Sequence, residues 1–141
     1  MLKHIIAQWE VNKHKLQEYF QTTNQKEYDS YRKILCKTIE LATPIANEDY
    51  GYLYDIKEIK EIYDKNYQGT KIFIILIDMY QPGIEDYIIT YIQYGSCSAY
   101  DTLYSIQCGN YDELPTDEQV KKYMTLALHL IQKMKPLYDL N

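Results

Sequence analysis

One stretch decides the fold of this chain: Lys71-Ile72-Phe73-Ile74-Ile75-Leu76-Ile77-Asp78-Met79-Tyr80. Its residues 72–77 are all apolar, so both faces are apolar, which is typical of a strand in the centre of a sheet. A turn follows at Gln81-Pro82-Gly83, and residues 86–94 then alternate between two faces, as a half-buried strand does. The two segments predict an antiparallel hairpin.

The preceding segment, residues 56–63, carries two conflicting signals. Its three isoleucines are spaced three residues apart, which fits a helix, whereas the turn residues at 66–69 fit a hairpin that follows a strand. We predict a strand here. Residues 56–94 then contain the antiparallel strands of the protein.

The segment before the strands has helical periodicity. Residues 3–20 and 24–42 each place their apolar side chains on one side, and Asn24 with Glu27 forms a capping box at the start of the second. Because the break between them is short, we predict a helical hairpin over residues 1–42.

The segment after the strands predicts a further helix. Thr116 and Gln119 form a second capping box, and an apolar stripe follows it through a helix predicted over residues 116–135. Residues 100–107 fit either a short helix or a strand. Residues 1–141 are therefore expected to form a single α+β domain of order ααβββα, with the helices packed on one face of a small antiparallel sheet.

A single core is expected from these stripes. Each helix has one apolar side, and the strand at 71–80 is central, so their apolar residues should meet. The residues expected to be buried together are Trp9, Leu35, Phe73, Ile75, Ala127 and Ile131.

The composition is that of a globular domain. Hydrophobic residues make up 46% and charged residues 25% of the chain, which excludes wholesale disorder. The net charge of −5 argues against direct binding to nucleic acid, whose phosphates call for a basic surface.

The cysteine count and the hydropathy point to a cytoplasmic setting. Cysteines lie at 36, 97 and 108, an odd number without the spacing of a disulfide framework. The N-terminus lacks the apolar segment of a signal peptide, and the longest apolar run, 72–77, is too short to cross a membrane. We expect a cytoplasmic protein that does not enter membranes.

Acidic and tyrosine residues are concentrated in the middle of the chain. Residues 43–115 contain 4 basic and 12 acidic side chains and 12 of the 17 tyrosines. Because the chain has only two Phe, several of these tyrosines must lie in the hydrophobic core. A solvated surface alone would account for the acidic side chains. Exposed tyrosines beside carboxylates also suit a binding surface for a basic partner. The candidate binding residues are Tyr52, Tyr54, Asp55, Glu58, Glu61, Asp64, Glu85, Asp86 and Tyr87.

A second candidate site follows the strand at 86–94. The sequence Gly95-Ser96-Cys97-Ser98-Ala99 resembles the turn that presents a nucleophile between a strand and a helix. The weak catalytic candidates are Cys97 and Asp101. A catalytic base would have to be one of the three histidines, His4, His14 and His129. A tight turn with a buried cysteine explains the same residues. The polar pocket proposed for this loop comprises Gly95, Ser96, Cys97, Ser98 and Asp101.

No metal site or cofactor is expected. Cys97 and Cys108 are too far apart for a Cys-x-x-Cys pair, and no Gly-rich phosphate-binding motif is present. The carboxylates at 112–113 and 117–118 fit the start of a helix, where they complement its dipole.

The stretch Tyr94-Gly95-Ser96-Cys97-Ser98-Ala99-Tyr100-Asp101-Thr102-Leu103 resembles a segment of small phage and prophage proteins of low-GC Gram-positive bacteria. That family, of unknown function, carries Tyr-Gly-Ser-Cys-Ser-Gly-Cys-Asp-Thr-Leu, and its C-terminal helix is similar to residues 123–135. Ala99 and Tyr100 replace the Gly-Cys of the family pattern, so a Cys-x-x-Cys role is lost in this chain.

Three functional hypotheses follow. The leading one is a phage-encoded accessory protein that binds a host protein with a basic surface and inhibits a host defence factor, in the manner of anti-CRISPR proteins. The sequence is more consistent with a protein that acts by binding than with an enzyme. The first alternative is an enzyme or a small-ligand or nucleotide binder centred on Gly95–Asp101. The second is a structural or regulatory phage protein that forms a homo-oligomer.

Overall fold

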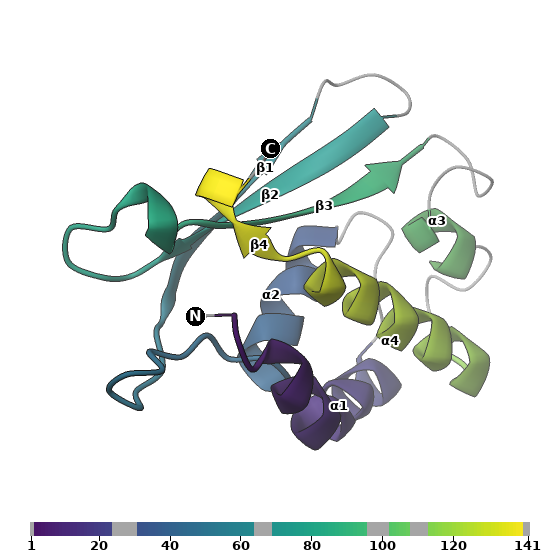
Figure 1. Ribbon diagram of the computed structural model, residues 1–141. Helices are drawn as coiled ribbons and strands as arrows, with labels where there is room; N and C mark the ends of the chain where they lie inside the picture. The colour runs from purple at the N-terminus through teal and green to yellow at the C-terminus, as the bar shows by residue number, and fades with distance from the viewer. Residues whose placement is uncertain (1, 24–30, 64–68, 96–101, 108–112, 140–141) are drawn as a thin grey trace.

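A four-stranded antiparallel sheet organises the computed structural model of this protein (Figure 1). The structure describes residues 2–23, 31–63, 69–95, 102–107 and 113–139. The strands lie in the order of the chain and are β1 (Ile56–Ile62), β2 (Gly69–Ile77), β3 (Ile88–Tyr94) and β4 (Lys135–Pro136). The prediction of a strand at 56–63 is therefore confirmed.

In the described residues, four α-helices accompany the sheet: α1 (Ile5–Thr22), α2 (Tyr31–Leu41), α3 (Thr102–Gln107) and α4 (Asp117–Gln132). Figure 1 shows α1, α2 and α4 on the same side of the sheet, and α3 near the end of β3. The predicted α+β fold is confirmed. Residues 100–107, whose sequence fits either a short helix or a strand, contain the helix α3.

The C-terminal segment differs from the prediction. The helix expected over 116–135 ends at Gln132, and Lys135 pairs with Ile89 of β3 in the strand β4. Pro136 contributes to the early end, because Lys135 before it avoids the helical conformation and proline has no N–H to bond the carbonyl of Gln132. The capping box at Thr116 is present, with its hydroxyl accepting a 3.2 Å hydrogen bond from the backbone N of Gln119.

The N-terminal pair of helices has different bounds from those predicted. The first helix ends at Thr22, two residues later than predicted, and the second begins its described part at Tyr31. The capping residues proposed for the second helix, Asn24 and Glu27, lie outside the described residues.

The sheet has two unlike faces. The side chains of Phe73, Ile75 and Ile77 on β2 are buried against the helices, whereas those of the intervening residues point to the other face. Ile72 on that other face is 37% exposed. The position of β2 between β1 and β3 confirms that it is central, but the helices cover only one of its apolar faces.

The core lies between the covered face and the helices. All six residues expected to be buried together belong to one hydrophobic cluster: Trp9, Leu35, Phe73, Ile75, Ala127 and Ile131. At the contact of α1 with α4, the ring of Phe20 stacks on that of Tyr123, with 5.1 Å between their centroids. The apolar stripes read from the sequence therefore do meet.

Candidate functional site

Two loops extend from the same end of the sheet as separate arms, residues 46–55 before β1 and residues 78–87 after β2 (Figure 1). Antiparallel pairing places the start of β1 beside the end of β2, and the backbone N of Asp78 donates a 2.8 Å hydrogen bond to the carbonyl of Asp55. We call residues 46–55 and 78–87 the acidic loop pair.

Asn47 organises the first loop. Its side-chain Oδ1 accepts hydrogen bonds from the backbone N of Asp49 at 3.0 Å and of Tyr50 at 3.1 Å, which closes a turn. Gly51 follows with a φ of +74°, a conformation that glycine adopts readily. The loop is thus held by its own polar groups.

Three tyrosines form a row along this loop. The ring of Tyr50 stacks on Tyr52 with 6.4 Å between centroids, and Tyr52 meets the edge of Tyr54 at 5.3 Å. Asn47 Nδ2 donates to the hydroxyl of Tyr54 at 2.8 Å and to that of Tyr52 at 3.3 Å. Tyr54 packs against the core, whereas Tyr52 is 51% and Tyr50 79% exposed. The row leads from the core to the solvent.

The second loop contains a short 3-10 helix, η1 (Ile84–Asp86). Asp86 Oδ2 accepts a 2.9 Å hydrogen bond from the backbone N of Gly83, which fixes the start of this turn. Tyr80 is 89% exposed and Ile84 is 59% exposed. The loop therefore presents apolar side chains to solvent on a hydrogen-bonded frame.

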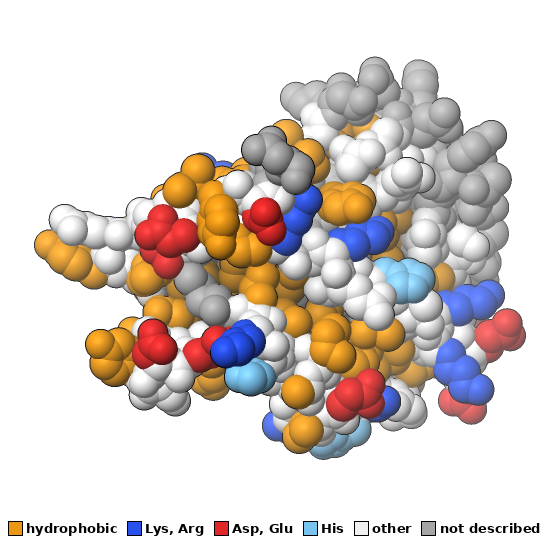
Figure 2. Space-filling model, in the orientation of Figure 1, with side chains coloured by type: hydrophobic (Ala, Val, Ile, Leu, Met, Phe, Trp, Pro, Cys, Tyr) orange, Lys and Arg blue, Asp and Glu red, His pale blue; other side chains and the backbone are white. Residues whose placement is uncertain are grey.

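The charge of the acidic loop pair is entirely negative. Its two segments contain six carboxylates and no Lys or Arg: Glu48, Asp49, Asp55, Asp78, Glu85 and Asp86. Figure 2 shows red carboxylate side chains between orange apolar tips at this end of the molecule. Carboxylates and exposed apolar side chains thus occur together at this end of the molecule.

The two loops also influence each other electrostatically. Exclusion of solvent raises the pKa of Tyr54, and the hydrogen bond to Tyr52 and the negative charge of Asp86 raise it further, although the hydrogen bond from Asn47 lowers it in part.

The structure brings together six of the nine residues predicted to bind. These are Tyr52, Tyr54, Asp55, Glu85, Asp86 and Tyr87, all within the acidic loop pair. Glu58 lies on β1 and is exposed. Glu61 lies near the opposite end of β1, where it contacts Lys71, and Asp64 is outside the described residues.

A cluster around Lys71 was missed in the sequence. Lys71 Nζ lies 5.2 Å from the ring centroids of Tyr63 and Tyr94, 5.8 Å from that of Tyr31, and 3.2 Å from Glu61 Oε1. These distances fit cation–π interactions. The five residues come from α2 and from the region of strands β1, β2 and β3, so only the folded arrangement of these elements brings them together.

The second candidate site is mostly outside the described residues. Gly95 is half-buried after the end of β3, and the remaining pocket residues, Ser96, Cys97, Ser98 and Asp101, are not described. The three candidate bases, His4, His14 and His129, are all exposed. Because Cys97 lies outside the described residues, its pairing with one of these histidines stays a prediction.

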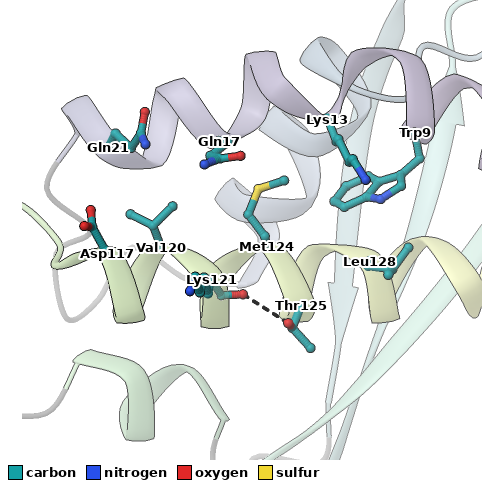
Figure 3. A pocket seen from close by; sticks show the side chains of 10 residues that line it. All are labelled: Trp9, Lys13, Gln17, Gln21, Asp117, Val120, Lys121, Met124, Thr125 and Leu128. Carbon is teal, nitrogen blue, oxygen red and sulfur yellow. Dashed lines mark hydrogen bonds between the residues drawn. The ribbon is translucent and has the colours of Figure 1, made fainter.

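A groove of about 650 Å³ runs between α1 and α4 (Figure 3). Trp9 and Met124 contribute apolar surface, and Lys13 and Lys121 lie along its sides. Its lining contains Asp117 but no His or Cys. The lining therefore combines apolar surface with the ionisable side chains Lys13, Lys121 and Asp117.

Within the described residues, no three His, Cys, Asp or Glu side chains are grouped so that they could hold a metal ion. No helix in the described part of the chain is both long enough and apolar enough to span a membrane. Comparisons with protein-family models, with curated proteins and with solved structures found no match for this chain.

Proposed function

We propose that this chain is a phage accessory protein that binds a host protein with a basic surface and inhibits a host defence factor, in the manner of anti-CRISPR proteins. The observation that carries the proposal is the acidic loop pair, where exposed tyrosines and six carboxylates gather at one end. The resemblance of residues 94–103 to phage and prophage proteins supports the phage setting.

The charges and the rings have separate tasks in such an interface. The six carboxylates of the loops attract a basic partner and increase the rate of association. Exposed aromatic rings provide the short-range contact energy, because they bury a large area at a small cost in side-chain entropy.

The frame of the first loop favours binding further. Asn47 holds the turn at Asp49 and Tyr50 and also bonds the hydroxyl of Tyr54. A loop fixed before the encounter loses less conformational entropy when it binds. The tyrosine row is thus arranged in advance for contact.

A site-specific crosslinking experiment tests the proposal. A photo-reactive amino acid replaces Tyr80, which is 89% exposed in the acidic loop pair, and in a matched control it replaces Val11, which is 71% exposed on α1. In host cells we expect one dominant protein partner, with a basic surface, from position 80 and none from position 11. Equal products from both positions, or none from position 80, would contradict the proposal.

Inhibition of defence needs its own measurement. A host with an active defence system should be infected more efficiently when it produces the wild-type protein. Tyr52→Ala should remove this gain, because it removes a ring that is 51% exposed in the proposed interface, while Tyr91→Ala, at a tyrosine 40% exposed on the uncovered face of β3, should keep it. If a partner binds but infection is not more efficient, the binding part of the proposal stands and the inhibition part is refuted.

A further inference from the structure

The strand β1 forms one edge of the sheet. The strand order is β1-β2-β3-β4, and no described strand pairs with the outer side of β1. An edge strand presents unpaired backbone N–H and C=O groups and is therefore a template for a further strand. The question is which strand fits this edge.

The sequence of β1 is complementary to itself in the antiparallel direction. It reads Ile56-Lys57-Glu58-Ile59-Lys60-Glu61-Ile62. When Ile59 is placed opposite the same residue of a second copy, every Lys faces a Glu and every Ile faces an Ile. Oppositely charged residues directly across an antiparallel pair stabilise it, and like charges destabilise it.

We propose that β1 pairs with β1 of a second copy of this chain around a two-fold axis at Ile59. Such an axis, perpendicular to the sheet, keeps the helices of both copies on the same side and joins the two sheets into one. The inference does not depend on the proposed function, since the acidic loop pair takes no part in the pairing.

The charges select this register among the alternatives. A two-fold axis at Lys57, Glu58, Lys60 or Glu61 would place identical charges opposite each other at the centre. The axis at Ile59 instead sets Glu58 opposite Lys60 of the partner subunit, and the symmetry repeats this pair. Ile59 itself is 6% exposed and packs in the core, so it keeps the strand in place.

The geometry of β1 concentrates the pairing at its centre. A bulge lies between Ile56 and Glu58, whereas residues 58–62 keep a regular register with β2. Glu58 and Lys60 are both exposed and lie on the face away from the helices. These two charges, on the regular part of the strand, therefore determine the register.

The pairing has a consequence for the shape of the dimer. The acidic loop pair lies where β1 begins, and antiparallel pairing reverses the second strand. The two acidic loop pairs then point to opposite ends of the joined sheet. The dimer would present two copies of the same surface in opposite directions.

A charge-swap experiment tests the pairing. Sedimentation velocity and light scattering should show a dimer for the wild-type chain. Glu58→Lys and Lys60→Glu should each weaken the dimer at least tenfold, because each creates two like-charge pairs. The double variant Glu58→Lys/Lys60→Glu restores the complementarity and should dimerise as the wild type does.

A mixture of the two single variants gives an independent arm. Glu58→Lys and Lys60→Glu chains should associate with each other although neither associates with itself. Glu10→Lys, an exposed change on α1, is the control and should leave the dimer unchanged, and circular dichroism should confirm that every variant is folded. A monomeric wild type, single variants that dimerise normally, or a double variant that stays monomeric would each overturn the proposal.

Discussion

The hydroxyl of Thr90 donates a 2.6 Å hydrogen bond to the carbonyl oxygen of Leu130, which joins β3 to the last turn of α4. Both residues are fully buried. The last carbonyls of a helix have no partner within the helix, so this hydroxyl satisfies a group that burial would otherwise leave unpaired. The bond also fixes the position of α4 on the sheet.

Thr90→Val should therefore lower the free energy of unfolding by about 1–3 kcal/mol, because it leaves a buried carbonyl without a donor while the volume hardly changes. Chemical denaturation measures the loss. Thr125→Val is the control, since its hydroxyl bonds to the Lys121 carbonyl on the exposed side of α4, and it should change stability by less than about 0.5 kcal/mol. Equal effects of the two changes would contradict this role of Thr90.

Ile75→Ala should destabilise the fold by about 2–5 kcal/mol, the usual range for a large-to-small change in a core. Ile75 is 0% exposed at the centre of β2. Ile72→Ala, on the uncovered face of the same strand, should cost under about 1 kcal/mol. A loss under about 1 kcal/mol for Ile75→Ala would mean that the covered face is not the one assigned here.

Lys71→Met should lower the free energy of unfolding by about 1–3 kcal/mol. Methionine retains contact with the tyrosine rings but leaves the carboxylate of Glu61, whose side chain is 22% exposed, without its cation. Thermal unfolding measures the change. Lys122→Met removes the exposed ion pair to Glu118 and should have an effect within about 0.5 kcal/mol. If Lys71→Met changes the free energy of unfolding as little as Lys122→Met does, the ion pair between Lys71 and Glu61 does not stabilise the fold.

The raised pKa of Tyr54 predicts an alkaline loss of stability. The folded protein holds this proton more tightly than the unfolded chain, whose tyrosines titrate near 10.0. The contribution of Tyr54 to the free energy of unfolding is therefore complete below pH 10, and it disappears as the pH rises through the higher pKa of the folded state. The free energy of unfolding should fall less steeply across this window in Tyr54→Phe. Tyr138→Phe is the control and should follow the wild type.

Charge reversal in the acidic loop pair should slow association with a partner and flatten its dependence on salt. The test variant is Asp49→Lys/Glu85→Lys, and Glu18→Lys/Glu113→Lys is the control with the same change of charge elsewhere. Tyr52→Ala should instead speed dissociation. Surface plasmon resonance separates the two rates once crosslinking has identified the partner. Unchanged rates for both test variants would place the interface outside these loops.

Local patterns predicted most of the fold. The apolar run at 72–77, the alternation at 86–94 and the stripes of the helices each depend on neighbouring residues, which a sequence displays directly. The strand β4 could not be found in this way, because two residues have no periodicity and Pro136 suggested only the end of a helix. Its partner Ile89 is distant in sequence.

The candidate site was predicted in part for the same reason. Acidic and tyrosine residues near positions 50 and 85 stand out in the composition, but only the pairing of β1 with β2 shows that the two loops share one end. Glu61 looked like a member of the same surface. The register instead directs it to Lys71, a contact that composition cannot reveal.

The packing of α1 against α4 joins the first helix of the chain to the last, and this affects the order of folding. The strands β1, β2 and β3 follow one another and close short loops, whereas the contact of α1 with α4 closes nearly the whole chain. Since loop closure costs more entropy as the loop lengthens, we expect the three strands to associate first. A chain leaving the ribosome can complete its core only after α4 has emerged, and until then the apolar side of α1 remains available to chaperones.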